Sequence, residues 1–185
     1  MLRTMMRAET VEGLGDRDAR AAAFRRLLET GLPRSYGIAA NMLGDSVEAQ
    51  DAVHDAAVAA WQRFNGLRDH DRFGPWFDRI LVNGCRDRLR ARRRRPVVDI
   101  AVTPDEALPR SPDLAAGIAV ADAVERAVRA LDPEHIAVIV LRYEADLTVP
   151  AIAERLGIAE GTVKSRLHHA LRRMRASIGD EEDGR

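Results

Sequence analysis

A run of basic and hydrogen-bonding side chains follows a glycine turn near the end of the chain. Guanidinium and ammonium groups bind phosphate oxygens, and guanidinium, amide and hydroxyl groups also bond the edges of bases. These residue types on one side of a helix predict contact with a nucleic acid. The alternative is that they form only a solvated helix face. The residues are Lys164, Ser165, Arg166, His168, His169, Arg172, Arg173 and Arg175.

The preceding residues predict the element that positions this face. Ile152 and Leu156 are spaced to lie on one side of a short helix, and Gly157 follows where a chain leaving a helix often adopts a left-handed conformation. Apolar residues resume at helical spacing from Val163. The pattern predicts a helix-turn-helix whose second helix can enter a DNA major groove. The same geometry also occurs as a simple packing solution.

The charge of the chain is segregated rather than spread evenly. The 185 residues carry 29 basic and 29 acidic side chains, so the formal net charge is zero. An average of this kind usually argues against nucleic-acid binding, but the segregation by segment is more informative. Arginines gather in 86–95 and 164–175, whereas acids gather in 45–55, 99–113 and 180–183.

The composition predicts an all-α protein with two small helical domains joined by a flexible linker, the C-terminal domain being the helix-turn-helix. Alanine, leucine and arginine dominate, and β-branched alternation is scarce. Gly31 and Pro33 predict a break in the first helical stretch. The expected segments are a disordered leader at 1–16, a first domain at 17–95, a proline-spaced linker at 96–117, a second domain at 118–178 and an acidic tail at 179–185.

Two features of the first domain predict helices with distinct faces. In 47–64, Val53 and Trp61 share an apolar face, while Asp51 and Asp55 lie off it. A longer helix begins near Pro75. From the residues alone, these acids are best interpreted as an ordinary solvated helix face.

Other features limit the classes of function. The single cysteine excludes an internal disulfide and a zinc site with several cysteines. No apolar run is long enough to cross a bilayer, so we expect a cytoplasmic protein. No residues cluster as a nucleophile, as paired acids or as a phosphate-binding loop, so we expect no enzyme, no cofactor and no metal.

Four stretches together resemble a known family. "GTVKSRLHHALRRMR", preceded by "LRYEADLTVPAIAERLGI", resembles the C-terminal DNA-binding region of bacterial sigma factors of the extracytoplasmic-function (ECF) group. "MLGDSVEAQDAVHDAAVAAW" and "RFGPWFDRILVNGCRDRLRARRRR" resemble the N-terminal conserved region of the same group. The resemblance spans roughly 22–177. A stand-alone helix-turn-helix regulator that binds DNA as a dimer remains the alternative.

The resemblance implies two binding tasks for the first domain. Its acidic helix is expected to dock on a coiled coil of the largest subunit of core RNA polymerase through Glu48, Asp51, His54 and Asp55, with His54 standing where the group commonly has glutamine. The loop and helix that follow are expected to capture a flipped base of the promoter −10 element and to contact its backbone. The residues expected to contact this element are Asn65, Arg68, Asp69, His70, Arg79, Asn83, Arg86, Arg88 and Arg90.

For the second domain the resemblance implies recognition of the promoter −35 element. His169 stands where the group usually has arginine. Regulation by an anti-sigma factor is typical of the group, although the residues identify no such partner. The residues expected to contact the −35 element are Arg142, Thr162, Lys164, Ser165, Arg166, His168, His169 and Arg172.

Overall fold

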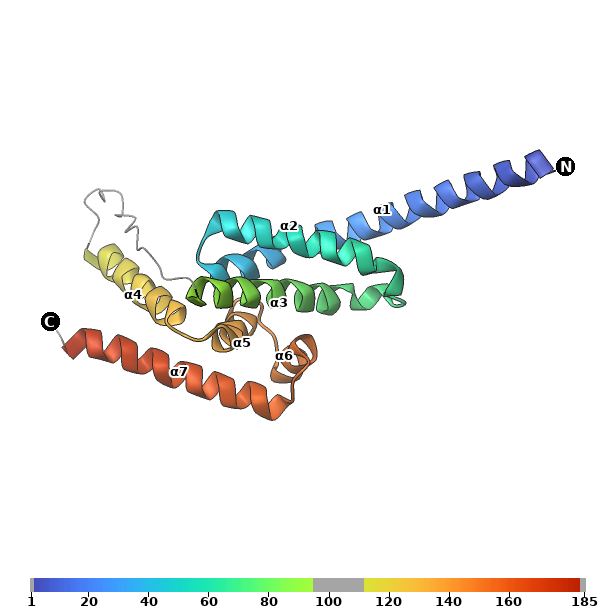
Figure 1. Ribbon diagram of the computed structural model, residues 1–185. Helices are drawn as coiled ribbons and strands as arrows, with labels where there is room; N and C mark the ends of the chain where they lie inside the picture. The colour runs from blue at the N-terminus through green and yellow to red at the C-terminus, as the bar shows by residue number, and fades with distance from the viewer. Residues whose placement is uncertain (1, 95–111, 184–185) are drawn as a thin grey trace.

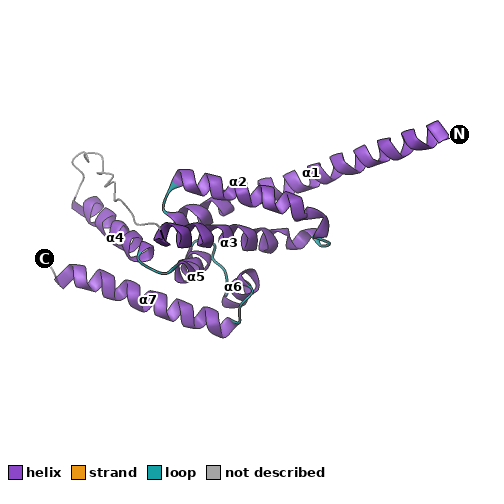
Figure 2. Ribbon diagram, in the orientation of Figure 1, coloured by secondary structure: helices purple, strands orange, loops and turns teal. Residues whose placement is uncertain are grey.

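Helices form every regular element among the residues that the structure describes (Figure 2). The computed structural model describes the backbone of residues 2–94 and 112–183, and the side chains of 17–94 and 120–179 (Figure 1). Short 3₁₀ turns at Phe64–Gly66 and His70–Arg72 connect the second and third helices. The helices are α1 (Leu2–Leu43), α2 (Ser46–Arg63), α3 (Phe73–Arg94), α4 (Pro112–Arg129), α5 (Pro133–Tyr143), α6 (Val149–Leu156) and α7 (Glu160–Asp183).

The first domain is a bundle of α1, α2 and α3. Asp45 caps α2 by accepting a hydrogen bond of 2.8 Å from the Glu48 backbone N–H. Small residues make the buried side of this helix and allow its neighbours to approach closely: Ala49, Ala52, Ala56 and Ala60 are buried together with Val53. Trp61, expected on the buried face, is instead 37% exposed and packs its ring against Phe24 at a centroid distance of 5.2 Å.

The first helix is longer and more continuous than the sequence predicts. α1 runs from Leu2 to Leu43 through Gly31 and Pro33, so the expected break is absent. The missing proline N–H removes one helical hydrogen bond. Phe24 before the proline and Ile38 after it are both buried in the same core, and this packing holds the two halves in line. The backbone of 2–16, expected to be a disordered leader, belongs to this helix.

The second domain contains the expected helix-turn-helix. Thr148 caps α6, and Gly157 ends it in a left-handed conformation with φ of 65°. Ile152, Val163 and Ala170 are completely buried between the two helices and α5. Residues 96–111 of the expected linker lie outside the described residues, as does Arg95 at the expected end of the first domain, whereas 112–117 form the start of α4.

The two domains pack against each other. Figure 1 shows α5 and α6 between α3 and α7, and both helices contact α3. Every residue from Ile136 to Leu141 is at most 6% exposed, because α5 contacts α1 and α3 on one side and α6 and α7 on the other. Buried side chains of both domains therefore form one continuous apolar core. This packing differs from the two separate modules that the sequence predicts.

Candidate nucleic-acid interface

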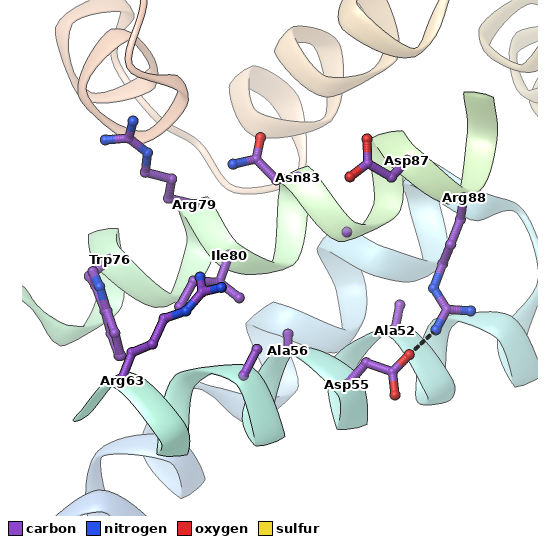
Figure 3. A pocket seen from close by; sticks show the side chains of 12 residues that line it. Ala52, Asp55, Ala56, Arg63, Trp76, Arg79, Ile80, Asn83, Asp87 and Arg88 are labelled. Atoms are coloured by element: carbon purple, nitrogen blue, oxygen red, sulfur yellow. Dashed lines mark hydrogen bonds and ion pairs between the residues drawn. The ribbon is translucent and has the colours of Figure 1, made fainter. Parts of the chain in front are cut away.

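Four polar residues of α3 form a stripe along one side of the helix. Arg79, Asn83, Arg86 and Arg90 recur at intervals of four, three and four residues, which is the spacing of one helical face. We call these four residues the α3 stripe. Figure 3 shows Arg79 and Asn83 pointing away from α2, on the side where the second domain lies. Asn83 accepts a hydrogen bond of 3.2 Å from Arg86, so neighbouring members of the stripe are in contact.

Arg88 lies on a different face of α3, although it is also among the residues expected to contact the −10 element. It lies two positions from Arg86, and successive residues of a helix turn by about 100°. Its guanidinium reaches across to Asp55 on α2 (Figure 3). The two side chains line a cavity of about 540 Å³ between α2 and α3. The side chain of Arg88 therefore points away from the α3 stripe.

The loop before α3 borders a second cavity, of about 390 Å³. Arg68 and Asp69 line it, together with Trp76 from the first turns of α3. Asn65 is exposed on the first 3₁₀ turn. His70 stacks on Phe64 with an interplanar angle of 14°, which fixes the ring at the surface of the loop. The loop thus combines an open hollow with side chains that can bond the edge of a base.

Acidic residues of the second domain pair with three arginines of α3, whereas Arg79 and Asn83 stay exposed. Arg86 and Arg90 both donate to Glu134 in the first turn of α5, the Arg86 bond being 3.2 Å long. Arg93 donates to Asp132 at 2.6 Å. Burial raises the pKa of Glu134, but hydrogen bonds from Arg90 and Arg86 outweigh it and lower the pKa to about 2. The hydrogen bond from Arg93 similarly lowers the pKa of Asp132.

A buried carboxylate joins three helices at the same boundary. Asp78 on α3 is 2% exposed and accepts a hydrogen bond of 2.8 Å from Arg155 on α6. Arg34 on α1 contacts the same oxygen at 3.1 Å. Arg155 also donates to the Ala151 carbonyl at 3.2 Å. The charges of this cluster are therefore paired, and the cluster links the two domains.

The acidic side of α2 is split between paired and exposed residues. Glu48 forms an ion pair with Arg92, and Asp55 pairs with Arg88, both within the first domain. Asp51 and His54 are exposed. His54 also lines an open, largely apolar groove of about 580 Å³ between α1 and α2. The groove is bounded by Leu28, Leu32, Pro33, Tyr36, Gln50, Val53, His54 and Ala57.

The outer face of α7 remains open to solvent. Arg166 is half-buried, and Arg172 contacts the His169 ring nitrogen Nδ1 at 3.3 Å. Arg142 is separate from this face, because it donates a hydrogen bond of 2.9 Å to the Leu147 carbonyl and holds the turn before α6. The expected residues that are exposed are Thr162, Lys164, Ser165, His168, His169 and Arg172.

The residues that sequence reasoning missed are the acids facing α3 and the loop. Asp132 and Glu134 come at the start of α5, where acids commonly stabilise a helix N-terminus and so attract no notice. Glu154 on α6 pairs with Arg72. The apolar run of α5 could have indicated that the domains are in contact, because a helix that is apolar on all sides is buried on all sides.

Two general features of the described part of the chain also bear on function. None of its helices is long and apolar enough to cross a membrane. Within the same residues, no group of three or more His, Cys, Asp or Glu side chains is arranged to hold a metal ion.

Comparison with known proteins identifies both domains. Sigma-70 region 2 matches residues 27–95, and Sigma-70 region 4 matches residues 127–176. The ECF RNA polymerase sigma factor SigL of Mycobacterium tuberculosis is 34% identical over 165 residues, covering 86% of this chain and 91% of SigL. SigW of Bacillus subtilis, another ECF sigma factor, is 28% identical over 176 residues, covering 90% of this chain and 92% of SigW.

Solved structures share the fold. The sigma factor RpoE of Bartonella quintana, solved in complex with the anti-sigma factor NepR, superimposes with a TM-score of 0.63 at 21% identity, covering 84% of this chain and 96% of RpoE. CnrH, solved with the cytosolic domain of CnrY, gives 0.59 at 26% identity, covering 91% of this chain and 97% of CnrH. Matches to both regions disfavour a stand-alone helix-turn-helix regulator. The chain belongs to the extracytoplasmic-function group of RNA polymerase sigma factors in the sigma-70 family.

Proposed function

We propose that the first domain binds core polymerase through the exposed side of α2. Asp51 and His54 lie at the surface, and His54 borders the apolar groove between α1 and α2. An acidic rim beside an apolar hollow suits a partner helix with basic and apolar residues, because opposite charges steer association and the apolar contact retains it. Glu48 and Asp55 flank this surface while paired to arginines of the same domain.

The α3 stripe and the loop before it are proposed to bind the −10 element. Guanidinium groups grip phosphates in pairs of hydrogen bonds, and the Asn83 amide can bond a base or the backbone. The cavity lined by Arg68, Asp69 and Trp76 is proposed to receive an unstacked base. This assignment depends on the position of the cavity next to the α3 stripe. Arg79 lines the cavity and is also the first residue of the stripe.

The second domain is proposed to read the −35 element through the exposed face of α7. Lys164 and Ser165 lie in its first turns, where a recognition helix faces base edges. Arg142 is proposed to act indirectly, by holding the turn before α6. The protein would then work in the cytoplasm, without catalysis of its own. Regulation by an anti-sigma factor is also proposed, because two proteins that share the fold were solved with a bound protein partner, and the partner of RpoE is the anti-sigma factor NepR.

Run-off transcription with purified core polymerase and fragments of genomic DNA tests the proposal. We expect promoter-dependent transcripts only when the protein is added. Asp51→Arg should abolish this activity and co-purification with core polymerase, because it reverses a charge at the proposed contact. Asp122→Arg makes the same charge change at an exposed site on α4 and should leave both intact. Absence of any new transcript with the unmodified protein would contradict the proposal.

A further inference from the structure

Two side chains on neighbouring turns of α7, those of His169 and Arg172, contact each other at the surface. Both are exposed, and the guanidinium nitrogen Nη2 of Arg172 lies 3.3 Å from Nδ1 of the His169 ring. Exposed Ser165 precedes them at an interval of four residues, and the next interval is three, so the three side chains share one face of the helix. Buried Val163 and Ala170 lie on the opposite side. The contact therefore belongs to the surface proposed to face the −35 element.

The chemistry of this contact determines which nitrogen of the His169 ring carries the proton. A guanidinium group can donate hydrogen bonds but cannot accept them, so Nδ1 must be the acceptor and must carry no proton. In such an imidazole the proton is on Nε2, which makes Nε2 a donor. Nε2 is also the ring nitrogen farther from the backbone. His169 therefore presents a single N–H donor to whatever the helix contacts.

A second neighbour restricts the same ring. The His168 ring meets the His169 ring edge to face, with a centroid distance of 5.8 Å and an interplanar angle of 75°. Rotation of the His169 ring by half a turn would place a carbon atom opposite Arg172 and would lose the hydrogen bond. Arg173, which follows Arg172, is engaged elsewhere, because it donates to Asp132 at 2.8 Å. Arg172 is thus the arginine that orients His169.

A lone donor limits which bases the helix can accept at one position. In the major groove guanine offers N7 and O6 as acceptors, adenine offers N7 and thymine offers O4, whereas cytosine offers only its N4 donor. A single N–H donor therefore excludes cytosine without choosing among the other three bases. An arginine at the same position would bond O6 and N7 of guanine together and would select guanine.

We propose that Arg172 positions the His169 ring so that its Nε2–H contacts one base of the −35 element and excludes cytosine there. The inference rests on the proposed assignment of the α7 face to −35 recognition. Arg172 is a positioning residue in this scheme, and its further N–H groups can still donate to a phosphate.

Selection of DNA by the holoenzyme tests this role. The probe is a duplex pool made from the strongest promoter found by run-off transcription, with its −35 segment randomised, and the bound and unbound fractions are sequenced. The unmodified protein should deplete cytosine at one position at least about fivefold, because cytosine would leave the donor of His169 unpaired. His169→Arg should instead enrich guanine at the same position about tenfold.

Variants of Arg172 then separate its hydrogen bond from its charge. Arg172→Met removes the donor to Nδ1, so the ring can carry its proton on either nitrogen, and an unprotonated Nε2 can accept from cytosine N4. We expect the depletion of cytosine to disappear at that position alone. Arg172→Lys keeps a donor that cannot accept and should preserve the depletion. The matched control, Arg175→Met, removes the same charge from an exposed site one turn further along α7 and should leave the base preference unchanged at every position.

The base preference distinguishes positioning from a simple phosphate contact. Loss of a phosphate contact weakens binding to all sequences alike and lowers the salt dependence by about 0.9. If Arg172→Met has only this effect and cytosine stays depleted, the positioning role is refuted. A change at a position other than the one altered by His169→Arg would refute it as well.

The same selection separates this inference from the function on which it rests. If the unmodified holoenzyme enriches no sequence in the randomised segment, the assignment of α7 to the −35 element is wrong. If a sequence is enriched but His169→Arg alters no position, α7 reads the element without His169, and only the inference made here is overturned.

Discussion

Replacement of Asp78 by asparagine probes the charge cluster between the domains. The side chain of Asp78 is 3% exposed, and that of its partner Arg155 is 11% exposed. Both arginines contact the same Asp78 oxygen, so the amide oxygen of asparagine can still accept from them, but it carries no negative charge. The charge of Arg155 would then remain buried without a counter-charge. Arg34, 39% exposed at its side chain, can still be hydrated and should contribute less to the cost.

The expected loss of stability follows from this burial. Removal of one partner from a buried ion pair typically costs about 3–5 kcal/mol. Because Arg34 is partly hydrated and Arg155 also bonds the Ala151 carbonyl, we expect about 3 kcal/mol, at the lower end of that range. With a denaturant dependence of about 2 kcal/mol per molar urea, the unfolding midpoint should fall by about 1.5 M.

Urea unfolding followed by circular dichroism measures this shift. Asp87→Asn is the matched control, because Asp87 lies on the same helix, pairs with Arg90 and is 74% exposed at its side chain. Exposed pairs contribute about 0–1 kcal/mol, so the control midpoint should move by less than about 0.5 M. A shift for Asp78→Asn no larger than that of the control would show that the buried cluster does not stabilise the folded protein.

Three further outcomes are expected. Gly157→Ala should destabilise the protein by about 1–2 kcal/mol, because it places a side chain on a residue with left-handed backbone conformation. Gly161→Ala, at a helical position with nothing nearby, should not destabilise it. Urea unfolding measures both changes. Burial raises the pKa of Cys85 from 9.0 to about 12. Between these values the unfolded chain loses the thiol proton and the folded protein keeps it, so the contribution of Cys85 to the free energy of unfolding is complete below pH 9 and is lost as the pH rises toward 12. Urea unfolding at a series of pH values measures this loss. Lys164→Ala with Arg166→Ala should flatten the salt dependence of duplex binding by about 0.9 per lost phosphate contact, while core-polymerase binding stays unchanged in a pull-down; parallel loss of both would contradict the division of tasks between the domains.

Local features of the fold could be predicted from the sequence because they depend on neighbours along the chain. The Asp45 cap, the left-handed Gly157 and the amphipathic character of α2 each follow from a few adjacent residues. The four-residue interval between Arg79 and Asn83 likewise suits one side of a helix. Local reasoning of this kind could not reveal the partner of Arg88, because nothing in the local pattern indicates Asp55, 33 positions earlier.

Contacts between distant segments lie beyond such reasoning. Arg86 and Glu134 are separated by 48 positions, and each has an ordinary local explanation, as a phosphate-binding residue and as an acid in a helix first turn. The break expected at Pro33 was wrong for a related reason, since burial of Phe24 and Ile38 outweighs one missing hydrogen bond. Whether the predicted binding residues act as assigned stays a prediction until the variants are measured.

The position of α5 has a consequence for solubility. Its central residues Ile136 to Leu141 touch apolar neighbours all round, so no side of this helix is suited to water. If the two domains separated, the apolar side chains of α5 that contact α1 and α3 would be exposed to solvent, and the protein would tend to self-associate. If the two domains separate during function, another surface should therefore cover α5. A variant whose domains are kept apart should precipitate at concentrations at which the native protein stays in solution.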